Sequence, residues 1–238
     1  MLAFPFSQHI KKAKTGLPLT NNTTPRKEAI NMASVQKWSS EGEVFAICRH
    51  NDRGAANPSN KQIDSNKTHL NYHLEPERDL SPYDYFKERK TQLYCYNRKD
   101  VVVMAGWVIT APKDLPDEQY KPFFQECYNF LEQKYGQENV IQSVVHYDEG
   151  GQPHLHFNFI PVVEDKKHSQ GLKICANEVL NPKELRCFHP ALQKHLNEAG
   201  IVAKIQTGIT KANGRNYTVK ELKQNVLRER EREEIWQW

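Results

Sequence analysis

Long apolar runs are absent from this chain of 238 residues, of which only 38% are hydrophobic. No segment approaches the ~18 consecutive apolar residues that a membrane-spanning helix needs, so we expect no membrane span. The opening Met-Leu-Ala-Phe-Pro-Phe run is too short, and too interrupted by proline, for a secretory signal peptide. Charged and aromatic residues, at 26% and 10%, are ordinary for a globular protein, which excludes a wholly disordered chain.

Paired cysteines are also absent. The five cysteines lie far apart, are odd in number and form no C-x-x-C pattern. This arrangement argues against a disulfide framework or a zinc ribbon and favours reduced thiols. We therefore expect a cytoplasmic protein.

The formal net charge of +4 comes entirely from the first 31 residues, so residues 32–238 carry no net charge. Net charge therefore neither favours nor opposes a nucleic-acid partner. Residues 1–31 are rich in Thr, Asn, Pro and Lys without a period, and we expect a disordered N-terminal arm there, with Met32 as an alternative start of translation. We expect a folded domain over residues 32–210 and a charged C-terminal helix over 211–238, where the run R-E-R-E-R-E-E occurs.

The pattern of apolar residues predicts alternating helices and strands. A capping box at Ser40 and Glu43 begins the first helix, and the apolar spacing after residue 117 makes the third helix the clearest. The expected helices are 41–53, 82–97, 117–135 and 182–199, and the expected strands are 33–38, 67–74, 101–110, 140–148, 154–163 and 201–206. The two strands around Gly150-Gly151 form a hairpin, which requires antiparallel pairing. The predicted class is therefore α+β, with a central antiparallel sheet and flanking helices.

The most informative run lies in this hairpin and reads His146-Tyr-Asp148-Glu149-Gly-Gly-Gln-Pro-His154-Leu-His156. His154 and His156 are two residues apart, so on a strand they point to the same face. If Asp148 pairs with His154, then His146 lies opposite His156 and all three rings converge. Three histidines around one metal ion, with a fourth position open, are typical of a catalytic rather than a structural site. The spacing matches neither the H-E-x-x-H proteases nor the zinc deaminases.

The His154-Leu155-His156 triplet resembles the metal-binding motif of the HUH endonucleases, which cut single-stranded DNA and remain attached to one end. Two further segments extend the resemblance, His50-Asn51-Asp52-Arg53 and His69-Leu-Asn-Tyr-His-Leu74, with Asn60 and Ile63 between them. In this order they are similar to the motifs of the Mob/Pre family of plasmid mobilisation relaxases, over roughly residues 33–208. One departure is that the loop from Glu149 to His154 is one residue longer than the common form.

The resemblance implies an HUH relaxase-like fold and a divalent metal, Mn²⁺ or Mg²⁺, held by His146, His154 and His156. Glu149 would complete the metal shell or orient a neighbouring group. Imidazole ligands suit Mn²⁺ better than Mg²⁺, which prefers oxygen. The metal would act as a Lewis acid on the scissile phosphate.

The resemblance also implies that His50 is the nucleophile, with Tyr72 as the alternative. Neutral imidazole is nucleophilic near pH 7, whereas a tyrosine of pKa ~10 must first lose its proton. Glu149 would select the tautomer of His50, and Arg53 would hold the phosphate. Asn60, Lys61 and Lys67 are further expected DNA-phosphate contacts.

The expected function is that of a relaxase, which nicks single-stranded DNA at a plasmid origin of transfer through a covalent protein–DNA intermediate. The lack of a P-loop agrees with transesterification, which needs no external energy source. The expected partner is single-stranded or supercoiled plasmid DNA, with a homodimer formed through the C-terminal helix. The alternatives are an HUH replication initiator or transposase, for which Tyr217 is the candidate nucleophile, and a non-catalytic DNA-binding remnant of a truncated relaxase.

Overall fold

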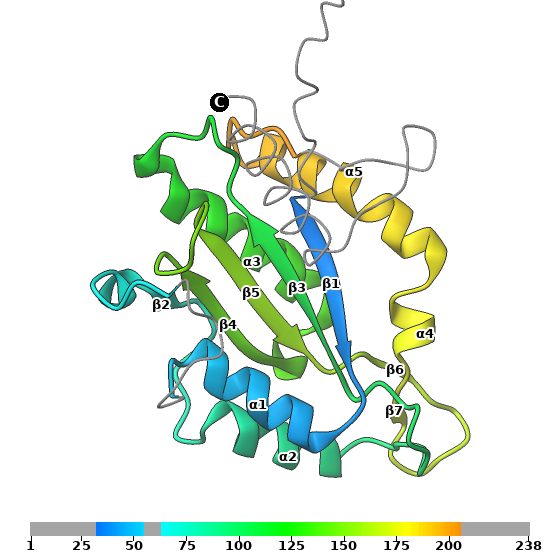
Figure 1. The fold of residues 1–238 in the computed structure, drawn as a ribbon. Coiled ribbons are helices and arrows are strands. Elements are labelled where there is room, and N and C mark those ends of the chain that lie inside the picture. Colours follow the sequence, from blue (N-terminus) through cyan, green and yellow to red (C-terminus); the bar gives the residue numbers. More distant parts are fainter. Residues whose placement is uncertain (1–31, 55–62, 206–238) are drawn as a thin grey trace, which may run out of the picture.

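The computed structural model describes residues 32–54 and 63–205, which build a five-stranded antiparallel sheet with helices on both faces (Figure 1). The strand order is β1-β3-β5-β4-β2, and β6 and β7 form a separate antiparallel pair. The strands are β1 Ala33–Trp38, β2 Tyr72–His73, β3 Met104–Thr110, β4 Val140–His146, β5 His154–Phe159, β6 Val162–Glu164 and β7 Leu172–Ile174. The predicted α+β class with a central antiparallel sheet is confirmed.

Several of the helices begin at a residue whose side chain caps the first turn. The Ser40 hydroxyl accepts the Glu43 N–H while the Glu43 carboxylate accepts the Ser40 N–H, and this capping box starts α1. Asn181 caps α5 in a similar way by accepting two backbone N–H groups. The helices are α1 Glu41–Asn51, α2 Pro82–Thr91, α3 Tyr120–Tyr135, α4 Ala176–Val179 and α5 Pro182–Glu198, with short 3-10 turns at Thr68–Leu70, Asp117–Gln119 and Gln137–Asn139.

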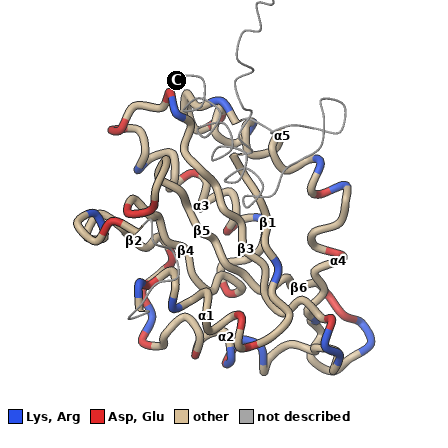
Figure 2. The backbone as a smooth tube through the Cα atoms, viewed as in Figure 1, with Lys and Arg blue, Asp and Glu red and all other residues tan. Residues whose placement is uncertain are grey.

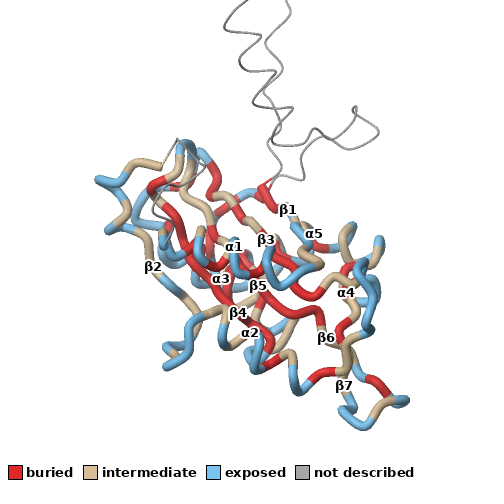
Figure 3. Tube along the Cα trace, turned by 60° about the horizontal axis from the view of Figure 1, so that its bottom comes forward, coloured by how far each residue is buried: buried red, intermediate tan, exposed pale blue. Residues whose placement is uncertain are grey.

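Two hydrophobic clusters cover the two faces of the sheet. On one face, Trp107 of β3 stacks on Phe188 of α5 with ring centroids 3.5 Å apart, and α3 adds Phe124 and Leu131. On the other face, Met104 belongs to the cluster formed with α1 and α2. The central strands β3, β4 and β5 are mostly buried (Figure 3) and carry no Lys, Arg, Asp or Glu (Figure 2). Because burying a polar side chain is unfavourable, the polar residues on these strands are candidates for functional residues.

Tertiary contacts override three of the predicted elements. The helix expected over 82–97 ends at Thr91, because Tyr94 instead exchanges backbone hydrogen bonds with β7. The expected strand 67–74 becomes a 3-10 turn followed by only two strand residues. The part of the expected strand 201–206 that is described, 201–205, forms no strand, because the Gln193 side chain bonds to the carbonyl of Ala203 and the N–H of Ile205.

The hairpin register also differs from the prediction. His146 pairs with His154, and Val144 pairs with His156. Asp148 lies in the connecting loop instead of the strand, where Arg53 binds its carboxylate. Because the shift is an even number of residues, every histidine stays on the predicted face.

The expected N-terminal arm (1–31) and charged helix (211–238) lie outside the described residues, as do Asn60 and Lys61. Within the described ranges, no helix has the length and apolar character needed to cross a membrane.

A glycine comparison tests the packing between β1, β3 and β5. A Cβ on Gly106 would lie 2.3 Å from Asn158 Oδ1 and 2.7 Å from Trp38 Cη2, whereas one on Gly42 would meet nothing within 4 Å. We expect Gly106→Ala to lower the free energy of unfolding by about 1–3 kcal/mol through overpacking. Gly42→Ala, in an exposed part of α1, should leave it unchanged or raise it by up to ~1 kcal/mol. Urea denaturation measures both, and a fully stable Gly106→Ala variant would contradict the packing described.

Candidate active site

Three histidines gather at one end of the β4–β5 hairpin. His146 ends β4, and His154 and His156 lie near the start of β5 on the same face. Their ring centroids are 4.8 to 5.8 Å apart. The predicted convergence of the three rings is confirmed, although through a different pairing.

Glu149 joins the three histidines from the loop after β4. Its Oε1 lies 3.5 Å from His146 Nδ1, and its Oε2 lies 3.9 Å from His154 Nε2. One ligand atom from each of Glu149, His146, His154 and His156 can be chosen so that all four lie within 4.8 Å of one another, as a metal ion requires. The longer loop therefore still brings Glu149 to the histidines.

The hydrogen bonds of the histidines leave nitrogens available for a cation. His146 Nε2 lies 2.9 Å from the Asn51 carbonyl, and His154 Nδ1 lies 3.2 Å from the Gln152 carbonyl. A carbonyl only accepts, so these nitrogens carry the protons, and the lone pairs of the neutral rings are at His146 Nδ1 and His154 Nε2. Both lone pairs face the Glu149 carboxylate, an arrangement that is repulsive unless a cation or proton lies between them. His156 Nε2 is buried without a hydrogen-bond partner among the described residues. This donor set fits a divalent metal.

Electrostatics favour the metal-binding forms of these side chains. Burial lowers the pKa of His154, and that of His156 further, which keeps both rings neutral at pH 7. Burial alone would raise the pKa of Glu149. With a proton between the carboxylate and the ring, its contacts with His146 and His50, together with the charges of His154 and Arg53, outweigh burial and lower that pKa, so the carboxylate stays ionised.

Arg53 fixes this loop against the end of α1. Its guanidinium donates to both Asp148 oxygens, to Glu149 Oε1 at 2.9 Å and to the His50 carbonyl at 2.9 Å. Burial would raise the pKa of Asp148, but hydrogen bonds from Arg53 and Thr68 outweigh it and lower the pKa to about 2. Arg53 has a φ of 56°, in the left-handed region, which costs a non-glycine residue roughly 1–2 kcal/mol. The ion pairs offset this strain.

His50 lies beside the histidine cluster. Its Nε2 is 3.3 Å from Glu149 Oε1, and its ring centroid is 6.3 Å from that of His146 and 6.5 Å from that of His156. The side chain is 29% exposed, whereas that of His146 is fully buried. His50 is therefore the most exposed histidine of this group, ahead of His154 at 13%.

Other expected site residues lie elsewhere. Tyr72 pairs with Val145, so its ring lies on the opposite sheet face, 6.2 Å from the ring of Tyr147, and burial raises its pKa well above the usual value. This position argues against Tyr72 as the alternative nucleophile. Lys67 is exposed at the start of the 3-10 turn Thr68–Leu70, and the hydroxyl of the next residue, Thr68, donates to Asp148 at 2.8 Å.

Sequence reasoning missed Gln142, a buried polar residue on β4. Its amide donates to the Cys48 carbonyl and to Asp52 Oδ1, at 3.3 and 2.6 Å, and accepts from the Asn51 amide at 3.0 Å. It therefore ties the last turn of α1, which carries His50, to the strand that carries His146. A glutamine inside the apolar run Val140-Ile-Gln-Ser-Val-Val145 was the available signal, since an unpaired polar group there is unfavourable.

This sheet, with a His-x-His strand at its centre and a third histidine on the neighbouring strand, defines an HUH endonuclease fold. The chain belongs to the plasmid recombination enzyme family, whose model matches residues 27–224.

Relatives and solved structures agree with this assignment. The chain is 29% identical over 214 residues to a plasmid recombination enzyme of Streptococcus agalactiae, covering 86% of this chain and 41% of the relative. It is 32% identical over 190 residues to one of Lactiplantibacillus plantarum, covering 76% and 49%. The chain thus spans less than half the length of these relatives. A crystal structure of the MobM relaxase domain, bound to Mn and to oriT DNA of plasmid pMV158, is similar with a TM-score of 0.66 and 28% identity, over 81% of this chain and 97% of that one.

Metal binding can be tested by its effect on stability. We expect Mn²⁺ at 100 times its Kd to stabilise the chain by about 2.7 kcal/mol. The His156→Ala variant, which lacks a ligand, should show little or no such increase. His195→Ala, which removes a histidine paired with Glu126 between α5 and α3, should respond like the wild type. Thermal unfolding of each variant with and without Mn²⁺ measures the increase, and an undiminished response in His156→Ala would contradict the site.

Proposed function

We propose that this chain is a metal-dependent DNA relaxase that nicks single-stranded DNA at a plasmid origin of transfer by transesterification and remains covalently joined to one end. The observation that carries the proposal is the position of His50, which is partly exposed, 3.3 Å from the Glu149 carboxylate and next to three converging histidines. Family membership supports it, as does the similarity to the MobM relaxase domain, which binds oriT DNA.

In this proposal, Glu149 and the three histidines hold one divalent metal. Mn²⁺ is preferred over Mg²⁺ because imidazole nitrogens provide most of the ligands and because the MobM domain contains Mn. When bound, the metal would polarise an oxygen of the scissile phosphate and stabilise the charge that develops there.

His50 acts as the nucleophile. The Glu149 carboxylate accepts the Nε2–H of His50, which leaves the lone pair at Nδ1. A bond forms between that nitrogen and phosphorus, the bond from phosphorus to the leaving oxygen breaks, and the DNA keeps a free hydroxyl end. The Nε2 proton passes through Glu149 to the leaving oxygen, which becomes that hydroxyl, and the phosphoramidate keeps a neutral ring and one negative charge on its phosphate oxygens. The attack needs no prior deprotonation, unlike attack by a tyrosine.

The remaining side chains position this chemistry. Arg53 holds Glu149 and the backbone of His50 together, and its positive charge would also stabilise the bound phosphate. Lys67, with Asn60 and Lys61, contacts further phosphates of the plasmid strand. A homodimer through residues 211–238 and a cytoplasmic location belong to the same proposal.

Substitution of each candidate nucleophile tests the proposal. On a supercoiled plasmid that carries the gene and its flanking DNA, with Mn²⁺ present, His50→Ala should reduce nicking by roughly a thousandfold or more. Tyr72→Phe and Tyr217→Phe should nick like the wild type. The trapped adduct should hydrolyse in acid, as a phosphoramidate does and a phosphotyrosine largely does not.

Two outcomes would replace the proposal. Loss of nicking only in Tyr217→Phe, with an acid-stable adduct, would indicate a replication initiator. Persistent DNA binding without any adduct in Mn²⁺ would indicate a non-catalytic DNA-binding module.

A further inference from the structure

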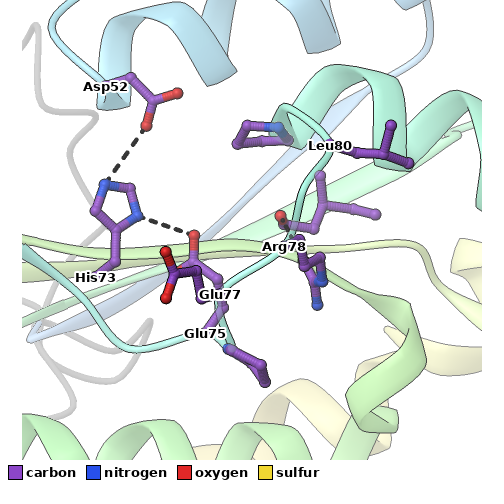
Figure 4. Close-up of a pocket in the computed structure, with 9 residues that line it drawn as sticks. Asp52, His73, Glu75, Glu77, Arg78 and Leu80 are labelled. Atoms are coloured by element: carbon purple, nitrogen blue, oxygen red, sulfur yellow. Dashed lines mark hydrogen bonds and ion pairs between the residues drawn. The ribbon is translucent and has the colours of Figure 1, made fainter.

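A cavity of about 480 Å³ lies beside the candidate active site, among the end of α1, β2 and the start of α2 (Figure 4). Its volume is within the range of pockets that bind small ligands. Three carboxylates line it, those of Asp52, Glu75 and Glu77, together with His73 and Arg78. Side chains such as Leu80 and Ile141 complete an apolar wall.

The cavity is on the same sheet face as the histidine cluster. His73 on β2 pairs with Val144 on β4, which pairs with His156 on β5, so the three form one cross-strand row. Two strand spacings of ~4.8 Å separate the backbones of His73 and His156. On the α1 side, Asp52 directly precedes Arg53. A DNA strand whose phosphate lies at His50 therefore has a neighbouring nucleotide within reach of this cavity.

The basic side chains of the cavity, Arg78 and His73, already have contacts within the protein. Arg78 donates to the Ile141 carbonyl at 3.2 Å and lies 3.9 Å above the Tyr85 ring. His73 lies between Glu75 at 2.9 Å and Asp52 at 3.6 Å, and these contacts are the dashed lines of Figure 4. Three carboxylates against these two basic side chains leave the cavity with no net positive charge to offer a ligand.

Hydrogen-bond acceptors remain. Both oxygens of Glu75 are already engaged. Its Oε1 contacts His73, and its Oε2 accepts the Ser143 N–H at 2.9 Å. Asp52 uses Oδ1 for Gln142 and His73 and keeps Oδ2. Glu77 is exposed and has no ion pair or side-chain hydrogen bond with any described residue. An acceptor-rich, partly apolar cavity repels phosphate and suits a neutral ring that carries N–H donors.

We propose that this cavity binds one unpaired base of the DNA strand, a base with an exocyclic amino group, and disfavours thymine. This inference rests on the proposed function, which supplies the single-stranded DNA. Carboxylates recognise bases by accepting from exocyclic amino groups such as N4 of cytosine, and thymine has none. Extruded bases are commonly held by such edge contacts together with apolar packing.

Homopolymeric oligonucleotides of equal length test the preference without any nicking. By fluorescence anisotropy at fixed salt, without added metal, the full chain should bind oligo-dC and oligo-dA about tenfold more tightly than oligo-dT, within the discrimination expected for a base contact. Glu77→Gln, whose amide also donates, should reduce the dC-to-dT ratio to about threefold or less. Glu118→Gln removes the same charge at an exposed position before α3 and should leave the ratio unchanged.

Equal binding of the three homopolymers by the wild type, or an unchanged ratio in Glu77→Gln, would overturn the proposal. So would a second Mn²⁺ per chain, seen by calorimetry and lost in Glu77→Gln, because the cavity would then bind a cation. These results are independent of the nicking assay. A base preference without a covalent adduct would leave the cavity assigned and reject the nuclease. An adduct without a base preference would support the nuclease and reject base binding in the cavity.

Discussion

The site depends on the hydrogen bonds and ion pairs of the Arg53 guanidinium. It joins the end of α1 to the loop after β4 by binding Asp148, Glu149 and the His50 carbonyl at once. The Asp148 side chain is fully buried, so removing the arginine would leave a buried carboxylate without its cation. The helix end and the hairpin loop are therefore held together, and His50 and Glu149 approach each other as a consequence. A left-handed backbone at Arg53 is tolerated because these contacts require it.

The histidine cluster is costly for folding in the absence of a cation. Two lone pairs face an ionised carboxylate, and a third ring nitrogen is buried without a partner among the described residues. Such groups are removed from water without full compensation, which lowers stability. The carbonyls of Asn51 and Gln152 nevertheless fix two of the rings in the orientation that a metal needs. The arrangement has the character of a binding site that is formed in advance, with stability given up for geometry.

Periodic patterns predicted much of this structure, and contacts between distant residues account for the rest. The apolar spacing predicted the helix Tyr120–Tyr135, and the glycines predicted the hairpin around Gly150-Gly151. The alternation of side chains along a strand also predicted that the three histidines share one face, although the predicted register was wrong by two residues. The segment 201–205 alternates in burial like a strand, yet Gln193 of α5 takes the hydrogen bonds that a strand would need. The Arg53–Asp148 pair joins residues 95 positions apart, and no local pattern indicates such a pairing.

Strand β2 shows how a short element divides functions between two sheet faces. Only Tyr72 and His73 pair with β4, and their side chains must point in opposite directions. Tyr72 enters the core under α3, whereas His73 faces the side of His50 and the histidine cluster. A tyrosine nucleophile at this position would require the register to slip by one residue, which would bury His73 among apolar side chains. The fold thus places the three histidines and His73, which lines the proposed base cavity, on one face of the sheet.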